Sequence, residues 1–301
     1  MQVAITGASG LIGGALARSL RADGHTVRPL VRRAPDGPDE IRWDPAAGTL
    51  DAGALEGVDA VVNLAGAPIG DRRWSEDRKR VLHDSRTQGT DLIARTLAGL
   101  ARPPAVLVSG SAVGYYGHER GDEVVTEVSA PGHGVLADLV RDWEAAAAPA
   151  ADAGIRTVLL RSGIVLDDEA GILPRLALPF RLFVGGRLGS GRQWVSWITL
   201  ADEVAAIRFV IDHGDVAGPV NAVAPEPVTN AELAKAIGTV LGRPSFLPAP
   251  ALAFRVALGR DMADELILAS QRVRPDVLVD AGFGFAHPEI TGALRAVWGR
   301  T

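Results

Sequence analysis

A glycine-rich turn near the amino terminus constrains the fold more than any other feature of this sequence. Gly7, Gly10 and Gly13 follow a short apolar segment and precede residues with helical periodicity, which end at Gly24. A strand, a tight turn and a helix in this order bring backbone amides close to a pyrophosphate at the positive end of the helix. The pattern predicts a dinucleotide site, and the alternative is an ordinary turn. The residues expected to contact the dinucleotide are Gly7, Ser9, Gly10, Leu11, Ile12 and Gly13.

Short segments of Val, Ile and Leu alternate with helical stretches through the first half of the chain. Continuous apolar strands that alternate with helices are typical of a parallel sheet covered on both faces. The sequence therefore predicts an α/β fold with a Rossmann-type, doubly wound parallel sheet. The expected strands are 2–5, 26–31, 60–64, 105–108 and 157–160, and the expected helices include 75–100 and 136–153.

The regular alternation ends near residue 166, where prolines and glycines indicate loops. We expect a dinucleotide-binding domain over 1–170, completed by a return segment near 195–220. A smaller, mostly helical substrate-side domain is expected from 171–194 and 221–301. In it, Thr229-Asn230-Ala231-Glu232 is typical of a capping box that begins a helix ending at Gly242.

Composition narrows the class of partner. The chain has 301 residues and a formal net charge of -5, which argues against a nucleic-acid or anionic-membrane surface. It has no cysteine, and its histidines lack metal-ligand spacing, so we expect no metal site. No apolar run approaches the ~20 residues that span a bilayer, and the first motif leaves no room for a leader segment before it. We expect a cytoplasmic protein with a small-molecule partner, and a homodimer stays open.

The residues after the second expected strand distinguish the two nicotinamide dinucleotides. An acidic residue at that place would bind the ribose 2′-hydroxyl of NAD. Here the sequence has Arg32 and Arg33 and no carboxylate. Because guanidinium groups suit a 2′-phosphate, the pair favours NADP(H). The alternative is that both arginines are solvated loop residues.

Several segments together resemble the extended short-chain dehydrogenases/reductases, the group of nucleotide-sugar epimerases and dehydratases. They are residues 6–13, Asn63-Leu64-Ala65-Gly66, Ser109-Gly110-Ser111 followed by Tyr115-Tyr116-Gly117, and the return segment 197–205. Shorter motifs are similar to an atypical branch usually labelled epimerase-family protein, which has a small C-terminal domain of unknown function. These motifs are Trp43-Asp44-Pro45, Arg73-Trp74, Asp142-Trp143-Glu144, Leu160-Arg161-Ser162-Gly163 and Gly189-Ser190-Gly191-Arg192. We interpret residues 221–244 as the beginning of that domain.

The resemblance implies further cofactor contacts outside the glycine turn. They are Leu64, Ala65, Gly66, Arg86, Ser109 and Val165. Arg86 stands where related enzymes have an asparagine near the cofactor. Its guanidinium is expected to contact the cofactor, with an ion pair to a neighbour such as Asp84 as the alternative.

The catalytic pattern of the resembling family is incomplete in this chain. Those enzymes use a tyrosine as acid or base, with a lysine four residues later that lowers its pKa. Aligning Glu144 with the glutamate of the family's helix puts Leu136 and Val140 at these two positions, and neither can transfer a proton. Ser111 matches the family's catalytic serine, or caps a turn. Tyr115 and Tyr116 are candidate proton donors, or pack in the core.

The expected substrate side is aromatic. Arg192, Trp194 and Trp197 precede and begin the return segment, and Val195 stands where the family has an arginine that binds a sugar-nucleotide phosphate. A flat or apolar ligand fits this composition, and packing between domains is the alternative for both tryptophans. We expect an NADP-dependent oxidoreductase or epimerase-like enzyme, and we retain a non-catalytic NADP(H) sensor or scaffold as the second hypothesis.

Overall fold

A mostly parallel sheet of eight strands forms the centre of the molecule in the computed structural model, which describes residues 1–299. Seven neighbouring strands run parallel, and only β4 is antiparallel to its neighbour. The expectation of a doubly wound Rossmann-type sheet is confirmed. From edge to edge the strands are β12 (Gly218–Ala222), β8 (Arg156–Ser162), β6 (Val106–Ala112), β5 (Ala60–Asn63), β1 (Gln2–Thr6), β2 (Thr26–Val31), β3 (Ile41–Asp44) and β4 (Thr49–Leu50).

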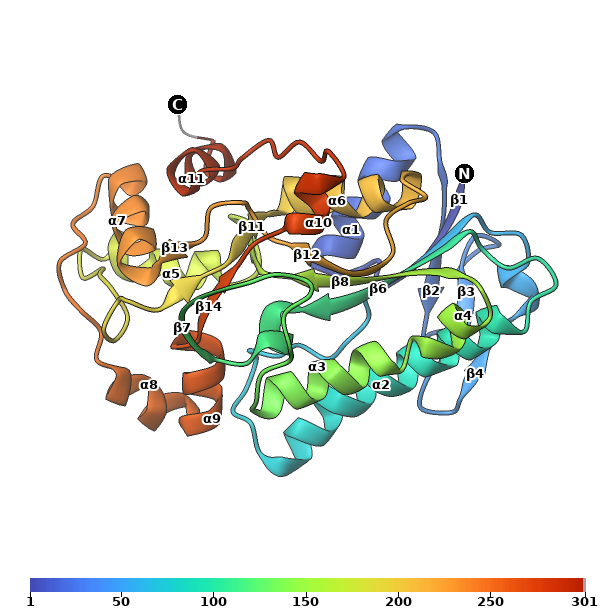
Figure 1. The fold of residues 1–301 in the computed structure, drawn as a ribbon, viewed down its shortest axis with the longest axis horizontal. Helices are drawn as coiled ribbons and strands as arrows, with labels where there is room; N and C mark the ends of the chain where they lie inside the picture. Colours follow the sequence, from blue (N-terminus) through green and yellow to red (C-terminus); the bar gives the residue numbers. More distant parts are fainter. Residues whose placement is uncertain (300–301) are drawn as a thin grey trace.

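Helices cover both faces of the sheet (Figure 1). One face carries α1 (Leu11–Ala22), α6 (Leu200–Asp212) and α10 (Asp276–Asp280). The other carries α2 (Glu76–Ala98), α3 (Val135–Ala145) and α4 (Ala148–Asp152). Alternate side chains of one strand enter the two cores, as Ile5 packs toward α1 and Ala4 toward α2. This two-sided burial explains why the strands are continuously apolar in sequence.

The C-terminal half adds a second lobe beside the carboxyl ends of the central strands (Figure 1). Its own core contains Trp197, Phe180 and Leu233. Its helices are α5 (Leu173–Arg181), α7 (Asn230–Leu241), α8 (Ala251–Leu258), α9 (Arg260–Met262) and α11 (Ile290–Val297), with the π-helical turn η3 (Ala263–Ile267). Its short strand pairs are β9 (Ile164–Leu166) with β11 (Trp197–Thr199), β10 (Trp194–Val195) with β13 (Val228–Thr229), and β14 (Ser270–Val273) with β7 (Glu119–Val125).

Local sequence signals explain several element boundaries. The capping box expected at Thr229 is confirmed, because the Thr229 hydroxyl accepts from the Glu232 amide and the Glu232 carboxylate accepts from the Thr229 amide. The helix ends at Gly242, whose left-handed conformation (φ 64°) favours glycine. The helix expected over 136–153 is instead two helices, α3 and α4. The break precedes Pro149, which has no N–H for an interior helical bond and is tolerated in the first turn of α4.

The hairpin of β3 and β4 was not expected from the sequence. Its strands have four and two residues, which is too short for a clear alternation of apolar and polar residues. Trp43 in β3 is buried against the α2 side of the sheet. Burial of Trp43 and Ile41 therefore packs this edge of the sheet against the core on the α2 side.

The helices and the ionisable side chains of residues 1–299 bear on membranes and metals. No helix there is both long enough and apolar enough to cross a bilayer. No group of three or more His, Asp or Glu side chains in the same residues is arranged to hold a metal ion.

We predict that Gly13→Ala destabilises the fold and Gly14→Ala does not. A Cβ atom on Gly13 would lie 2.3 Å from the Gly7 carbonyl oxygen, whereas the nearest atom to one on Gly14 is 3.4 Å away. The first change should lower the free energy of unfolding by about 1–3 kcal/mol. The second should raise it by up to ~1 kcal/mol, because alanine is the better helix former. Urea denaturation measures both, and equal effects at the two positions would contradict the close packing of the turn.

Candidate functional site

The glycine turn and the loop after β5 are joined by the side chain of Thr6. Its hydroxyl donates to Asn63 Oδ1 at 2.7 Å and accepts from the amides of Leu64 and Ala65 at 3.0 and 3.1 Å. Gly7 has φ 67°, and a Cβ there would lie 3.0 Å from the Leu64 backbone. The structure thus brings together the two segments that the sequence assigned to one dinucleotide.

Arg86 lies under the same loop. Its guanidinium donates to the Leu82 carbonyl at 3.0 Å and the Ala67 carbonyl at 3.1 Å, and it lies 5.2 Å from the Trp143 ring centre. A Cβ on Gly66 would be 3.1 Å from Arg86 Cζ. Burial, with a contribution from the Arg78 charge, lowers the pKa of Arg86 to about 10. Arg86 therefore supports the cofactor-side loop, and it forms no ion pair with Asp84 in the described structure.

The two arginines after β2 differ in their surroundings. Arg33 pairs with Glu40 at 2.6 Å and with Asp36 at 2.8 Å, and its hydrogen bond to Glu40 raises the pKa of Arg33 and lowers that of Glu40. Arg32 is exposed and has no ion-pair partner among residues 1–299. Arg32 is therefore the guanidinium that is free to meet a phosphate, while Arg33 would have to exchange its carboxylate partners.

Three further residues expected at the cofactor lie nearby but differ in access. Ser109 is fully buried in β6, so its side chain presents no surface to a ligand. Val165 in β9 is half-buried against the core on the α1 side. Leu11 lies 3.5 Å from the position of a Cβ on Gly171, so the segment after β9 contacts the glycine turn.

A buried ion pair lies at the carboxyl end of β6. The Ser111 hydroxyl donates to Glu144 Oε1 at 2.6 Å. The same carboxylate receives two hydrogen bonds from Arg161, from Nε at 2.7 Å and from Nη2 at 2.8 Å. The side chains of Arg161 and Glu144 are only 2% and 9% exposed. Burial alone lowers the pKa of Arg161, but its bonds to Glu144 outweigh burial and hold that pKa above its ordinary value. Ser111 is thus oriented by a carboxylate that is itself fixed in the core.

The two tyrosines expected as proton donors have opposite environments. Tyr116 is fully buried; its hydroxyl donates to Asn221 Oδ1 at 2.8 Å and accepts from Arg161 at 3.0 Å. Burial raises the pKa of Tyr116 to about 12, so its proton is unsuited to exchange near neutral pH. Tyr115 is half-buried, with the Arg161 guanidinium 3.5 Å from its ring centre. Its hydroxyl has no hydrogen-bond partner in the described part of the chain.

Leu136 and Val140, which we aligned from the sequence with the family's tyrosine and lysine, are buried apolar side chains. Leu136 and Val140 lie on the face of α3 that packs against Gly114 in η2 (Val113–Tyr116). A Cβ on Gly114 would lie 3.4 Å from Leu136 and 3.6 Å from Val140. These two side chains fill the space between α3 and η2 and carry no exchangeable proton. Ser111 and Tyr115 are the candidate protic side chains at the carboxyl end of β6.

The three expected substrate-side residues do not form one surface. Trp197 is fully buried, and its indole N–H donates to the Glu226 carbonyl at 3.1 Å, so this side chain belongs to the core. Trp194 is half-buried between Asp122, which accepts its indole N–H, and Arg272, 4.2 Å from its ring centre. Arg192 is exposed. Arg192 and Trp194 stay candidates for ligand contact.

Glu144 and Arg161 were missed as site residues by sequence reasoning, although both lie in motifs that carry the family resemblance. A signal was available, because Arg161 directly follows the apolar run Val158-Leu159-Leu160 of β8, and a charged residue in a buried strand needs a partner. The identity of that partner depends on the packing of α3 on β8, which spacing does not give.

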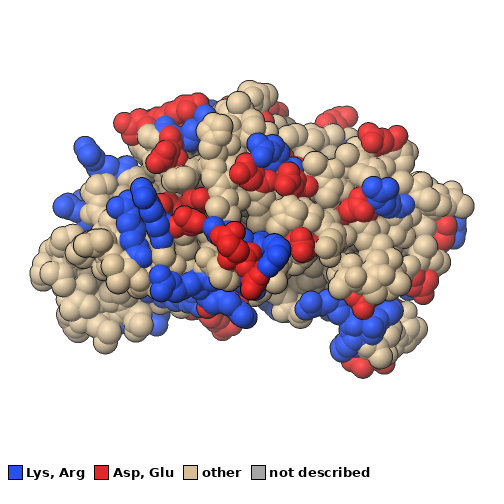
Figure 2. Space-filling model, turned by 90° about the horizontal axis from the view of Figure 1, so that it is seen from below, with Lys and Arg blue, Asp and Glu red and all other residues tan. Residues whose placement is uncertain are grey.

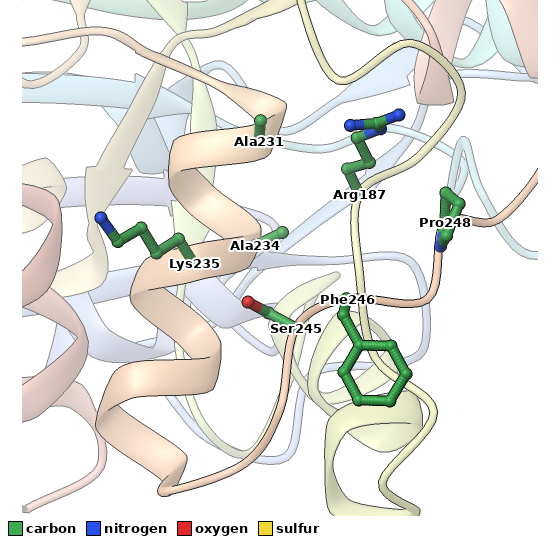
Figure 3. A pocket seen from close by; sticks show the side chains of 7 residues that line it. All are labelled: Arg187, Ala231, Ala234, Lys235, Ser245, Phe246 and Pro248. Carbon is green, nitrogen blue, oxygen red and sulfur yellow. The ribbon is translucent and has the colours of Figure 1, made fainter.

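A hollow of about 290 Å³ lies elsewhere, beside α7 (Figure 3). It is lined by Arg187, Ala231, Ala234, Lys235, Ser245, Phe246 and Pro248. Lys235 extends away from Arg187 (Figure 3), so the two cations do not converge on one ligand group. None of the lining residues comes from the edge that carries Ser111, and we assign no role to this hollow.

A second buried carboxylate lies on the α6 side of the sheet. Glu203 is fully buried, accepts a hydrogen bond from the Ser162 hydroxyl at the end of β8, and its Oε2 has no partner among the described residues. Burial raises the pKa of Glu203 to about 7, although the bond from Ser162 opposes the rise. Near neutral pH this group is therefore close to its titration midpoint.

Comparison with known proteins identifies the family to which the parallel sheet and its glycine turn belong. Residues 3–223 match the model of the NAD dependent epimerase/dehydratase family. The chain belongs to this family. Residues 249–297 match a domain of unknown function, DUF1731, so the match begins after the residues near 221 that we interpreted as its start. An epimerase family protein of Mycobacterium leprae is 47% identical over 97% of this chain and 94% of its own length.

Solved structures extend the likeness to three dimensions. The human epimerase family protein SDR39U1, solved with NADPH, has a TM-score of 0.91 and 35% identity, with 100% of both chains covered. A nucleoside-diphosphate sugar epimerase of Corynebacterium glutamicum has a TM-score of 0.83 and 37% identity, over 99% of this chain and 58% of that one. The expectation of an epimerase-family protein with a C-terminal domain of unknown function is confirmed.

We predict that the free energy of unfolding falls as pH rises from 5 to 8, and that Glu203→Gln removes much of this fall. The pKa of Glu203 is raised from 4.5 to about 7 in the folded protein. The folded state therefore binds more protons than the unfolded state in that window, and stability is lost as the carboxyl ionises. The contribution is at most about 3 kcal/mol. Urea denaturation at several pH values measures it, and an unchanged slope in the variant would contradict it.

Proposed function

We propose that this chain binds NADP(H) at the glycine turn and acts as an oxidoreductase or epimerase-like enzyme on a small molecule. The observation that carries the proposal is the Ser111–Glu144–Arg161 network at the carboxyl end of β6. It lies at the sheet edge where ligands bind in open α/β sheets. The NADPH in the human relative and the pair of arginines after β2 support NADP(H) over NAD.

The residues that would hold the cofactor fit its chemistry. Gly7 and Gly13 allow close backbone approach, and α1 begins directly after Gly10, so its first amides face the turn. Arg32 offers a free guanidinium to a 2′-phosphate. When bound, the nicotinamide ring supplies or accepts the hydride. The protein is left to orient the substrate and to move a proton.

Ser111 is set to bind a hydroxyl group of the substrate. Its own proton is donated to Glu144, so its oxygen lone pairs are what it can offer to a ligand. Tyr115 has the protic group that is not committed to another residue on this edge. In the proposed reaction the Tyr115 phenol gives its proton to the carbonyl oxygen of the substrate during reduction, and the resulting phenolate takes the proton of the reacting hydroxyl during oxidation. Ser111 accepts a hydrogen bond from a second, non-reacting hydroxyl of the substrate.

A second function is favoured by one specific observation. The apolar pair Leu136 and Val140 removes the family's usual acid and its cation. The non-catalytic alternative is an NADP(H)-binding sensor or scaffold whose partner binding depends on the cofactor. It keeps the glycine turn and needs no proton transfer at Tyr115.

The proposed partner of this chain is a small molecule. In Figure 2 basic side chains gather at the left of the face shown and along its lower edge, with acidic side chains beside them. The formal net charge of -5 supports a small-molecule partner rather than a nucleic acid or an anionic membrane. A cytoplasmic location belongs to the same proposal, and a homodimer stays open.

The test measures hydride transfer with NADPH and NADH in parallel, across a panel of carbonyl compounds and the matching alcohols. We expect faster turnover with the phosphorylated cofactor. Tyr115→Phe and Ser111→Ala should each lower kcat roughly 100-fold or more, the usual contribution of a positioned acid–base group. The dissociation constant for NADPH, followed by tryptophan fluorescence, should change little, because neither side chain holds the glycine turn.

Ser19→Ala is the matched control for Ser111→Ala. Ser19 lies in α1, and its hydroxyl accepts from Arg208 rather than from the catalytic edge. Equal affinity for both cofactors would overturn the role of Arg32. NADPH binding without turnover on any substrate would favour the sensor.

A further inference from the structure

The C-terminal unit, defined as residues 249–297, makes direct hydrogen bonds to the turn that carries Tyr115. Gln271 in β14 donates from Nε2 to the Val113 carbonyl at 3.1 Å and to the Gly117 carbonyl at 2.6 Å. These two acceptors lie at the beginning of η2 and directly after its end. One amide group therefore spans the whole turn and fixes it against β14.

The same unit caps the helix that carries Glu144. The buried Glu265 carboxylate accepts from the amide of Val135 at 2.9 Å and from the amide of Leu136 at 2.8 Å. Gly134 at the N-cap has no side chain that could do this. A carboxylate at this end also faces the positive pole of the helix. Glu265 thus replaces the missing local cap of α3 with one from more than a hundred residues later in the chain.

Two more contacts join the unit to the same edge. Asn221, which accepts from the Tyr116 hydroxyl, donates to the Arg274 carbonyl at 2.9 Å. Lys79 near the start of α2 pairs with Asp261 at 2.7 Å. The contacts of residues 249–297 with the Rossmann half therefore include both elements that carry the proposed chemistry.

We propose that this domain of unknown function assembles the catalytic edge, with Gln271 and Glu265 as positioning residues. Gln271 acts through η2 on Tyr115, and Glu265 acts through α3 on Glu144 and so on Ser111. The catalytic role of this edge rests on the proposed function. The attachment of η2 and α3 to the C-terminal unit, called the brace below, rests on the hydrogen bonds of Gln271 and Glu265 alone. Neither residue contacts the glycine turn, so the brace is independent of cofactor binding.

The test compares Gln271→Asn and Glu265→Gln with the control Asp264→Asn in the full chain. The asparagine amide is one methylene too short for both carbonyls, and the glutamine presents an N–H to one of the two helix amides. Asp264 is the neighbour of Glu265, but its ion pairs to Arg255 and Arg260 stay inside the C-terminal unit. Backbone amide hydrogen exchange is measured with and without NADPH.

We expect Gln271→Asn to speed exchange over residues 113–118 and Glu265→Gln to speed it over 134–137, each by about tenfold or more. Tenfold corresponds to about 1.4 kcal/mol, the order of one hydrogen bond to a charged or buried group. In both variants, exchange in β1 and β5 should be unchanged. In the control Asp264→Asn, exchange should be unchanged in all regions outside 251–269. Unchanged exchange in the two target segments overturns the proposal. A rise that extends to β1 and β5 also overturns it, because the residues would then stabilise the whole fold.

The activity readout separates positioning from mere stability. In the hydride-transfer assay both variants should lose at least tenfold in kcat, while the dissociation constant for NADPH stays within about twofold. Glu265→Asp, which retains two carboxylate oxygens, should restore part of the loss. If kcat is unaffected by either variant, the two residues do not position the edge. If the unmodified protein transfers no hydride, the proposed function fails, and the exchange data still decide whether the brace exists.

Discussion

The ion pair of Arg161 and Glu144 is the interaction on which the candidate site depends. A guanidinium and a carboxylate that are almost completely buried are stable only when each satisfies the other. Their partners extend the pair across the sheet: Ser111 lies on β6, Glu144 on α3, Arg161 on β8, and Tyr116 in η2 reaches Asn221 on β12. A single polar network therefore sets the distance between the strands' carboxyl ends and the helix above them.

This network divides the two tyrosines into different roles. Arg161 and Asn221 hold the Tyr116 hydroxyl in the core, which leaves Tyr115 with the free phenol. The network also fixes the direction of the Ser111 proton. The apolar residues Leu136 and Val140 pack against Gly114 in the turn that carries both tyrosines and add no charge there. The proposed chemistry thus relies on Ser111 and Tyr115 at the carboxyl ends of the parallel strands.

The sequence predicted the features that depend on residues close together in the chain. The turn from Gly7 to Gly13, the parallel sheet and the capping box at Thr229 all follow from spacing over a few residues. The partner of Arg161 could not be predicted in this way, because Glu144 meets it only when α3 packs on β8. The same holds for Glu265, which caps a helix that begins at Val135. The sequence placed Trp197 on the substrate side, but its side chain is buried in the core. The position of an aromatic residue in the sequence does not show whether its side chain faces a ligand or the core.

The most direct test of the account is a double-mutant cycle on the buried pair, with Arg161→Met and Glu144→Gln made singly and together. Each single change leaves one buried group without its partner and should lower the free energy of unfolding by about 3–5 kcal/mol. The double variant should be less destabilised than the sum of the singles by roughly 2 kcal/mol or more, within the range of direct contacts. Strictly additive effects, measured by urea denaturation, would contradict the claim that this pair organises the site.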